Sequence, residues 1–417
     1  MSTSFSVFSF LIDAYPSWDA LKTHLTSADG GRLRVDDNST PESPYALIRY
    51  TKGISDLTLP HVRAFRSVVW DVSKNMPVSA FPFKSEDGEG LPTDDVFSDS
   101  YVVETFVDGV GVGMFWDAYS HRWRIHTRST LDATCRYYSQ TKTFATMFAE
   151  ATSDLDYGAL IKEHNYNWVL QHPENRIVVP VAEPRAYLVS VGGVRPGGTY
   201  VEMVPYSESP ISKKYGLASV SGGCSSWADV QAVVSSSNDT FKWRSQGIVV
   251  KHTPSGRRYK LRNAEYNRVR VLRGNTARLD FHWLTKWADS TLFDYIAVYP
   301  EERARINTLV DKWKRVTGDV FHIYTDVFKA RSLDKSAIPP KYKPLIYGLH
   351  NLYVTGLKPA GKSVDWKATV EYMNGRDTAQ KLFVLNWELR QAAQQIGAPM
   401  IPVEPASVVE AIVTPDA

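Results

Sequence analysis

Short runs of apolar and β-branched residues recur along the first two-thirds of the chain, and turn residues separate them. The clearest runs lie at 68–70, 101–103, 113–116, 123–125, 176–179, 186–191 and 247–250. The breaks between runs include Asp-Gly at 87–88 and 108–109, Gly-Gly at 192–193, Pro-Gly-Gly at 196–198 and Pro-Ser-Gly at 254–256. This pattern predicts a mostly antiparallel β core with a few helices, one of them over 141–151.

Beyond about residue 280 the apolar residues take a helical spacing, over 291–329, 341–357 and 366–396. The last stretch is rich in Pro, Val and Ala, which is typical of a loose tail. We therefore predict an α+β domain over residues 1–280, an all-helical domain over 281–398, and a flexible tail over 399–417.

Composition narrows the class of protein. The 417 residues carry a net charge of +3, so binding to nucleic acid would need a local basic patch. The two cysteines, Cys135 and Cys224, exclude a disulfide framework and a cysteine-rich metal site. The first 22 residues lack a basic leader region, and we read them as a strand or short helix of the fold. With no long apolar run, we expect a soluble, intracellular and cytoplasmic protein without a membrane partner.

Six segments, in order, resemble those of the phage and large-virus type of ATP-dependent RNA ligase, a family of covalent nucleotidyltransferases. They are 64–70 (AFRSVVW), 81–84 (FPFK), 104–109 (ETFVDG), 123–129 (WRIHTRS), 168–178 (WVLQHPENRIV), and 246–250 (QGIVV) together with 259–262 (YKLR). The long string at 168–178 is the most specific. The runs 299–301 and 349–353 are similar to the helical domain that follows in such ligases. The resemblance covers about residues 45–390.

The resemblance implies a nucleotidyltransferase domain of two antiparallel sheets with a nucleotide cleft between them. It also implies ATP and Mg²⁺ as cofactors, if the cleft still functions, and RNA as substrate. Such ligases first use a lysine amine to attack the α-phosphate of ATP, then pass AMP to an RNA 5′-phosphate, and finally join a 3′-hydroxyl. The first step needs an amine that can lose its charge at neutral pH.

Two positions depart from the family pattern. The family's K-x-D-G motif places its lysine two residues before Asp108, where this chain has Phe106, which carries no nucleophilic atom. The family's E-G-x-V motif places a glutamate where this chain has Gln246, which is neutral and a poorer metal ligand. Lys84, in KSEDG, is one residue too far from its Asp-Gly to replace the missing lysine. We therefore predict no catalytic residue and no resident metal.

The other family positions keep their residue types. We assign nucleotide or RNA phosphate binding to Arg66, Lys84, Asp108, Gly109, Trp168, Lys260 and Arg262. Each has a simpler alternative. Asp108-Gly109 can be a hairpin turn, Trp168 can be a core residue, and the cationic side chains can be solvated charges on strands or loops. Lys260 and Arg262 alternate along one strand and so share a face. His172 lacks a partner at metal-ligand spacing.

The stretch 251–273 holds eight basic residues, with Tyr259 and Tyr266 among them. They are Lys251, Arg257, Arg258, Lys260, Arg262, Arg268, Arg270 and Arg273. Basic groups interleaved with aromatic rings suit a track for single-stranded nucleic acid. An ordinary charged β-ribbon and helix end is the alternative.

Three functions remain open from the sequence. The first is a ligase-like pseudoenzyme that keeps nucleotide-phosphate or RNA binding. The second is an active enzyme that uses another nucleophile or seals RNA that is already adenylated. The third is a structural or assembly protein with a vestigial cleft. The expected partners are single-stranded or nicked RNA, or proteins of an assembly, and a location in a virion or host cell is compatible with each.

Overall fold

The computed structural model describes residues 2–5, 7–93, 96–194, 199–203, 209, 211–217, 224–235 and 242–395. The chain divides into two compact units, the first ending at Asn275 and the second beginning at Thr276. The predicted tail over 399–417 and the turn at 196–198 lie outside the described residues. None of the described helices is both long and apolar enough to cross a membrane.

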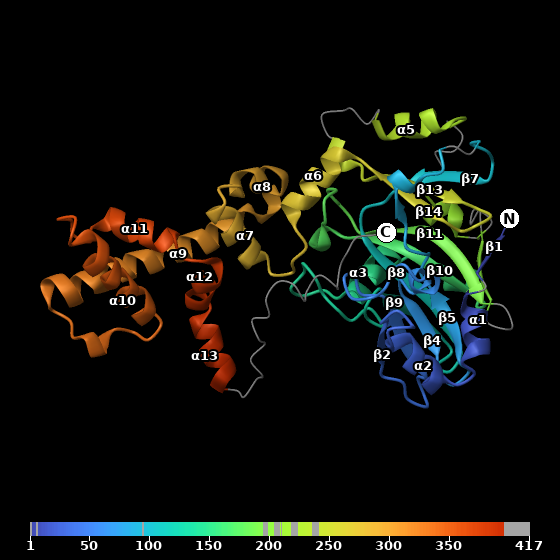
Figure 1. Ribbon diagram of the computed structural model, residues 1–417, viewed down its shortest axis with the longest axis horizontal. Coiled ribbons are helices and arrows are strands. Elements are labelled where there is room, and N and C mark those ends of the chain that lie inside the picture. Colours follow the sequence, from blue (N-terminus) through green and yellow to red (C-terminus); the bar gives the residue numbers. More distant parts are fainter. Residues whose placement is uncertain are drawn as a thin grey trace. The chain divides into compact units, whose positions relative to one another are not determined.

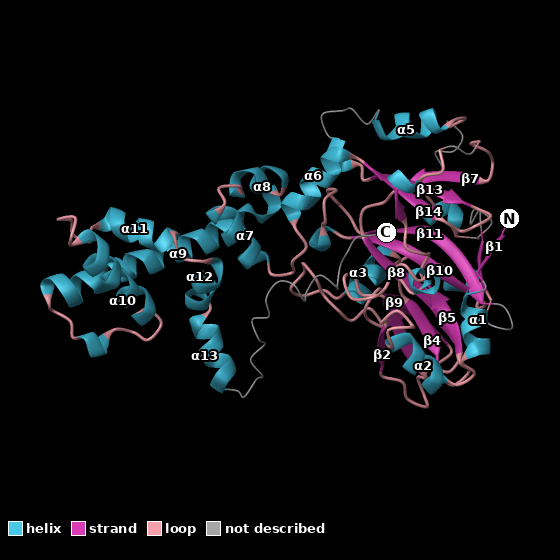
Figure 2. Ribbon diagram, viewed as in Figure 1, coloured by secondary structure: helices cyan, strands magenta, loops and turns pink. Residues whose placement is uncertain are grey.

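Three sheets build the first unit within its described residues (Figures 1 and 2). A six-stranded antiparallel sheet has the order β1-β12-β11-β10-β8-β9. Its strands are β1 (Ser2–Phe5), β12 (Tyr200–Met203), β11 (Arg185–Val194), β10 (His164–Gln171), β8 (Val110–Asp117) and β9 (Arg122–Thr127). A four-stranded sheet has the order β6-β14-β13-β7, in which only the short β6 pairs in parallel. Its strands are β6 (Glu86–Asp87), β14 (Arg258–Arg262), β13 (Gly247–His252) and β7 (Tyr101–Thr105).

The third sheet is an antiparallel meander of β2 (Arg34–Asp37), β3 (Tyr45–Arg49), β4 (Val68–Asp71) and β5 (Met76–Ala80). One face packs on α1 (Val7–Ala14) and α2 (Trp18–Thr26) through a core that includes Phe8, Leu21 and Trp70. The other face meets Phe115 of β8 through Tyr45, Leu47 and Val69. Successive strand residues point to opposite faces of a sheet. Both faces of this sheet carry apolar residues, because other elements cover each face.

Shorter elements complete the first unit. The helices are α3 (Phe144–Ala151), α4 (Ser212–Tyr215), α5 (Trp227–Ser235) and α6 (Ala264–Arg273). The 3-10 turns are η1 (Pro60–Ala64), η2 (Gly88–Gly90), η3 (Tyr157–Ala159), η4 (Pro173–Asn175) and η7 (Lys242–Arg244). Thr143 caps α3, which begins three residues later than the predicted start at 141.

The predicted strand over 176–179 is wrong. These residues follow η4 as an irregular segment. The backbone N–H groups of Val178 and Val179 donate to the Asp108 carboxylate rather than to a neighbouring strand. A β-branched run therefore folds as a loop because a buried side chain satisfies its backbone donors.

The second unit is helical in its described part, as predicted. Its helices are α7 (Leu279–Ala288), α8 (Leu292–Val298), α9 (Arg303–Tyr324), α10 (Lys343–Leu352), α11 (Trp366–Asn374), α12 (Thr378–Leu385) and α13 (Trp387–Gln395). Single turns are η8 (Pro300–Glu302), η10 (Lys335–Ala337), and the π-helical η9 (Thr325–Ala330) and η11 (Tyr353–Leu357). A core including Trp313, Ile346 and Met373 joins α9, α10 and α11. An α+β unit of mainly antiparallel sheets followed by a helical region is therefore the observed architecture.

Candidate functional site

The sheet β6-β14-β13-β7 has one apolar face and one charged face. Val103, Ile248 and Tyr259 pack on the apolar side against Val230 of α5. The alternate positions form the opposite face, and four of its charged residues are buried: Glu104, Lys251, Arg258 and Lys260. Burying charges is costly unless they are paired or bind a ligand. The charged face is therefore the part of the first unit in which function is most expected.

An ion pair between Lys251 and Glu104 occupies part of this charged face. Lys251 Nζ lies 2.8 Å from Glu104 Oε2, and the two side chains are only 5% and 8% exposed. The same amine donates to the carbonyl oxygen of Val189 on β11, at 3.0 Å. Lys251 thus links the four-stranded sheet to the six-stranded sheet.

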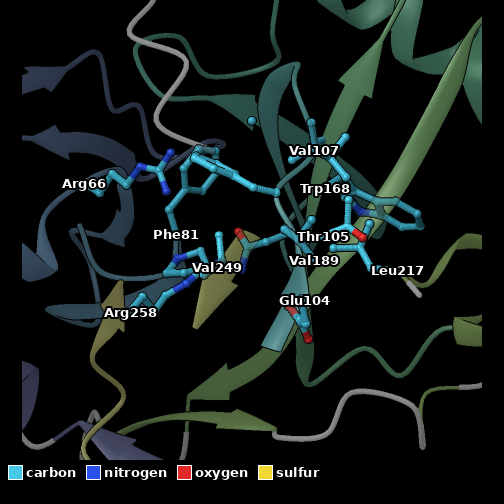
Figure 3. A pocket seen from close by; sticks show the side chains of 15 residues that line it. Arg66, Phe81, Glu104, Thr105, Val107, Trp168, Val189, Leu217, Val249 and Arg258 are labelled. Carbon is cyan, nitrogen blue, oxygen red and sulfur yellow. The ribbon is translucent and has the colours of Figure 1, made fainter. Parts of the chain in front are cut away.

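A narrow pocket lies beside this ion pair, with about 460 Å³ of atom-free space including its mouth (Figure 3). Two cationic side chains, Arg66 and Arg258, line this pocket. The guanidinium carbon of Arg66 lies 5.9 Å from the centre of the Phe81 ring. Most of the remaining wall is apolar. It comprises Phe81, Pro82, Phe106, Val107, Gly111, Trp168, Val169, Val189, Leu217 and Val249, and the other polar residues are Glu104, Thr105 and Asn167.

Phe106 belongs to the wall of this pocket. It directly follows β7, and its N–H donates to the carbonyl of Gly247 at 2.9 Å. The ring is 2% exposed, and the guanidinium carbon of Arg262 lies 5.3 Å from its centre. The position that the resemblance assigns to the nucleophile therefore holds an apolar ring packed against a cation.

Gln246 adjoins Phe106 through Gly247, which also pairs with Arg262 across β13 and β14. Its side chain is 2% exposed, and neither its amide nitrogen nor its amide oxygen has a hydrogen-bond partner among the described residues. Leaving a buried polar group unsatisfied costs about 1–3 kcal/mol. The carboxamide is therefore a candidate contact for a bound ligand.

Three further polar atoms in the pocket wall lack a hydrogen-bond partner within the described part of the chain. They are Trp168 Nε1, Asn167 Oδ1 and Arg258 Nε, on side chains that are 1%, 2% and 5% exposed. The Asn167 amide nitrogen donates to the carbonyl of Ala80 and to Ser190 Oγ, which orients its oxygen. The wall therefore contains two buried donors and one buried acceptor whose hydrogen bonds the described residues do not satisfy.

Asp108 is turned away from the pocket. Its carboxylate accepts hydrogen bonds from the N–H groups of Val178 and Val179 at 3.0 and 2.9 Å, and from Tyr266 Oη at 2.7 Å. Burial raises the pKa of Asp108, and these hydrogen bonds oppose that rise. Asp108 therefore fastens the segment after β7 to α6 and to the irregular segment 176–179.

Asp108-Gly109 connects two different sheets, since β7 pairs with β13 whereas β8 pairs with β9 and β10. The hairpin-turn alternative is therefore wrong. A side chain at Gly109 would meet the Leu170 carbonyl oxygen at 2.5 Å. Glycine is needed here because the crossing segment lies directly against β10.

The structure brings together only some of the predicted residues. Arg66, Phe106 and Trp168 line the pocket, and Arg262 and Gln246 adjoin it. Lys84 lies in the loop before β6, and its Nζ is 3.4 Å from the Ser85 carbonyl. Lys260 Nζ lies 3.4 Å from Asp87.

His172 Nε2 lies 2.9 Å from Glu150. Among the described residues, no cluster of three or more His, Cys, Asp or Glu side chains could hold a metal ion.

The sequence interpretation placed Arg258 and Lys251 in a basic stretch, but it did not assign Arg258 to the pocket or pair Lys251 with Glu104. A signal was present for Arg258, because strand alternation places it on the same face as Lys260 and Arg262. No local spacing could reveal the ion pair, because its partners are 147 positions apart in the chain and meet only through the pairing of β7 with β13.

Comparisons with known proteins give distant matches. No family model matches the chain, and no curated protein matches it. Among solved structures, a putative ATP-dependent DNA ligase from Aquifex aeolicus matches with a TM-score of 0.40 and 13% identity, over 91% of this chain and 80% of the other. Form 1 of an archaeal ATP-dependent RNA ligase matches with a TM-score of 0.40 and 12% identity, over 92% of this chain and 98% of the other. Form 2 of an archaeal ATP-dependent RNA ligase matches with a TM-score of 0.39 and 10% identity, over 72% of this chain and 74% of the other. The chain thus has a distant structural similarity to ATP-dependent DNA and RNA ligases.

Proposed function

We propose that the first unit binds a nucleotide without forming a covalent adduct, as a ligase-like pseudoenzyme. The observation that carries the proposal is Phe106 itself. Its ring occupies the wall of a pocket that still contains buried cationic side chains and unpartnered polar atoms. The cations and polar atoms favour retained binding, and the ring excludes attack on phosphorus from this position.

The chemistry of the wall suits a nucleotide. Arg66 and Arg258 offer guanidinium groups to phosphate oxygens, and a guanidinium can bind two such oxygens at once. Phe81 and Phe106 offer ring faces to a base. Trp168 Nε1 and Asn167 Oδ1 can complement an acceptor and a donor on that base.

Covalent chemistry has little support from the neighbouring lysine. The Lys251 amine is engaged by Glu104 and by the Val189 carbonyl, and both of those residues line the pocket. We therefore expect the protein to bind ATP and to leave it intact.

Two measurements test this proposal. Incubation with ATP labelled at the α-phosphate, with Mg²⁺ present, should give no labelled protein band. Isothermal titration calorimetry with ATP should show binding that Arg258→Ala weakens at least tenfold, since a charge-assisted contact is worth about 1.5–3 kcal/mol. Arg257→Ala is the matched control, because Arg257 is the adjacent arginine, 51% exposed and paired with Glu86.

The alternatives give different results. A labelled band would overturn the proposal in favour of an enzyme with another nucleophile. Ligated product from 5′-adenylated RNA and an acceptor strand would show that sealing survives. Absence of any ATP binding would overturn the proposal and leave the assembly role, with RNA or protein partners sought elsewhere on the chain.

A further inference from the structure

Positive charge is concentrated in one stretch of the helical unit. Residues 329–367 contain eight Lys and Arg and two Asp, although the whole chain has a net charge of only +3. Six of the cationic residues are exposed: Lys329, Arg331, Lys335, Lys358, Lys362 and Lys367. We call these six the lysine patch. We propose that the lysine patch and the aromatic rings beside it bind single-stranded nucleic acid, independently of the nucleotide pocket.

Contacts within the second unit show that the segments carrying the lysine patch lie close to one another. Lys329, in the π-helical turn after α9, donates to the carbonyl of Val364 in the loop before α11. Lys335, in the loop before α10, lies 5.4 Å from the centre of the Phe328 ring. The end of α9 and the loops on either side of α10 are therefore close in space, and their cations share one region of the unit.

The carboxylates of this stretch are used in local structure. Asp334 accepts from the Ser336 N–H at 2.8 Å, and Asp365 accepts from the Ala368 N–H at 2.7 Å, so that each caps the start of a helix. Asp326, one turn before Lys329, is the nearest further carboxylate in the sequence. The patch thus has a strong excess of positive charge, which attracts a polyanion.

Aromatic rings lie among the cations. The Phe328 and His350 rings are stacked, with centres 3.9 Å apart and planes within 14°, and Tyr353 lies 6.0 Å from His350. Trp366, next to Lys367, is 50% exposed and rests edge-to-face on Phe321. Aromatic rings beside cations are one means by which proteins bind unpaired bases along with their phosphates.

The backbone at this place is also unusual. Both α9 and α10 end in π-helical turns, η9 (Thr325–Ala330) and η11 (Tyr353–Leu357), which carry Phe328 and Tyr353. Such turns are rare and often lie at functional sites, because they turn side chains out of helical register. The rings favour nucleic acid over an acidic peptide or an anionic membrane, since neither of those provides planar groups to stack.

Fluorescence anisotropy with a labelled, mixed-sequence, single-stranded 20-mer RNA tests the proposal on the full chain. Lys358→Glu/Lys362→Glu should weaken binding at least tenfold and make its salt dependence shallower, by about 0.7 in logarithmic slope for each lost phosphate contact. The matched control is Lys312→Glu/Arg315→Glu, which makes the same charge change at exposed positions earlier on α9 and should weaken binding less than threefold. Trp366→Ala should weaken binding at unchanged salt slope.

Equal loss of affinity in the patch and control variants would overturn the proposal. So would equal affinity of the patch for polyglutamate, or for vesicles of anionic lipid, because the rings would then contribute nothing. Excess ATP should leave RNA binding unchanged. Competition by ATP would place the RNA in the nucleotide pocket instead, and would also overturn the proposal.

Discussion

The guanidinium carbon of Arg262 lies 5.3 Å from the centre of the Phe106 ring. The resemblance places both positions at the centre of phosphoryl transfer. Arg262 keeps the basic residue type that the resemblance assigns to phosphate binding, whereas the Phe106 ring opposite it replaces the family's lysine and has no atom that could attack phosphorus. Gln246 lies beside both through Gly247, with its carboxamide buried and unpartnered within the described residues.

The first prediction concerns rebuilding the missing chemistry. We expect Phe106→Lys/Gln246→Glu to become labelled by α-labelled ATP with Mg²⁺, whereas wild type and Phe106→Lys alone do not. Arg262 would lower the pKa of the new amine, which would then form an N–P bond as pyrophosphate leaves. The new carboxylate would restore the lost negative charge.

The matched control is Phe106→Arg/Gln246→Glu, which carries the same charges without a usable nucleophile. Labelling should be absent there. An adduct on this control, or on the wild-type chain, would contradict the assignment of position 106, and peptide mass spectrometry would then identify the modified residue.

The second prediction concerns the buried ion pair. Glu104→Gln should lower the free energy of unfolding of the first unit by about 3–5 kcal/mol, because it leaves the Lys251 ammonium buried without its counter-charge. Glu104→Gln/Lys251→Met should recover most of that loss. Urea unfolding followed by tryptophan fluorescence measures both. A double variant no more stable than the single one would show that the pair is not the cause.

Much of this architecture could be predicted from the sequence, since apolar alternation and helical spacing depend on local residue patterns. The segment 176–179 could not, because its β-branched residues read as a strand until the Asp108 carboxylate binds their N–H groups. For the site, the motifs assigned Phe106, Gln246 and Arg262 to positions of one family site, and the structure places Phe106 beside Arg262 and beside Gly247, which follows Gln246. The inward positions of Glu104 and Lys251 depend on strand pairing across distant parts of the chain, which no local pattern encodes.

The third prediction concerns Asp108 as a fastening residue. Asp108→Asn should destabilise the first unit by about 2 kcal/mol or more, because a neutral amide oxygen accepts the two backbone N–H groups more weakly than a carboxylate and the amide NH₂ cannot accept the Tyr266 Oη–H bond. Tyr266→Phe removes only one of these bonds and should cost about 1 kcal/mol. Thermal unfolding of the two variants shows which substitution lowers the stability of the first unit more. The reverse order would mean that Tyr266, rather than Asp108, holds the segment.

The last prediction concerns pH. His126 is fully buried, with its ring nitrogens 3.2 Å from Ser67 Oγ and 2.9 Å from Ser79 Oγ, and burial lowers its pKa from 6.5 to about 4. The unfolded chain therefore binds a proton at this residue below pH 6.5, whereas the folded chain binds it only near pH 4. Stability is full above pH 6.5 and falls as the pH drops from 6.5 to 4, by about 3 kcal/mol in total.

Urea unfolding at pH 7.0 and pH 4.5 tests this dependence. Wild type should lose about 2–3 kcal/mol more between these values than His126→Gln, which cannot take up the proton. The control is His121→Asn, because His121 is exposed and has a positive φ that asparagine tolerates. It should retain the wild-type slope. If His126→Gln lost stability on acidification as steeply as wild type, the buried imidazole would not be the group that takes up the proton on unfolding, and the acid sensitivity would belong to other groups.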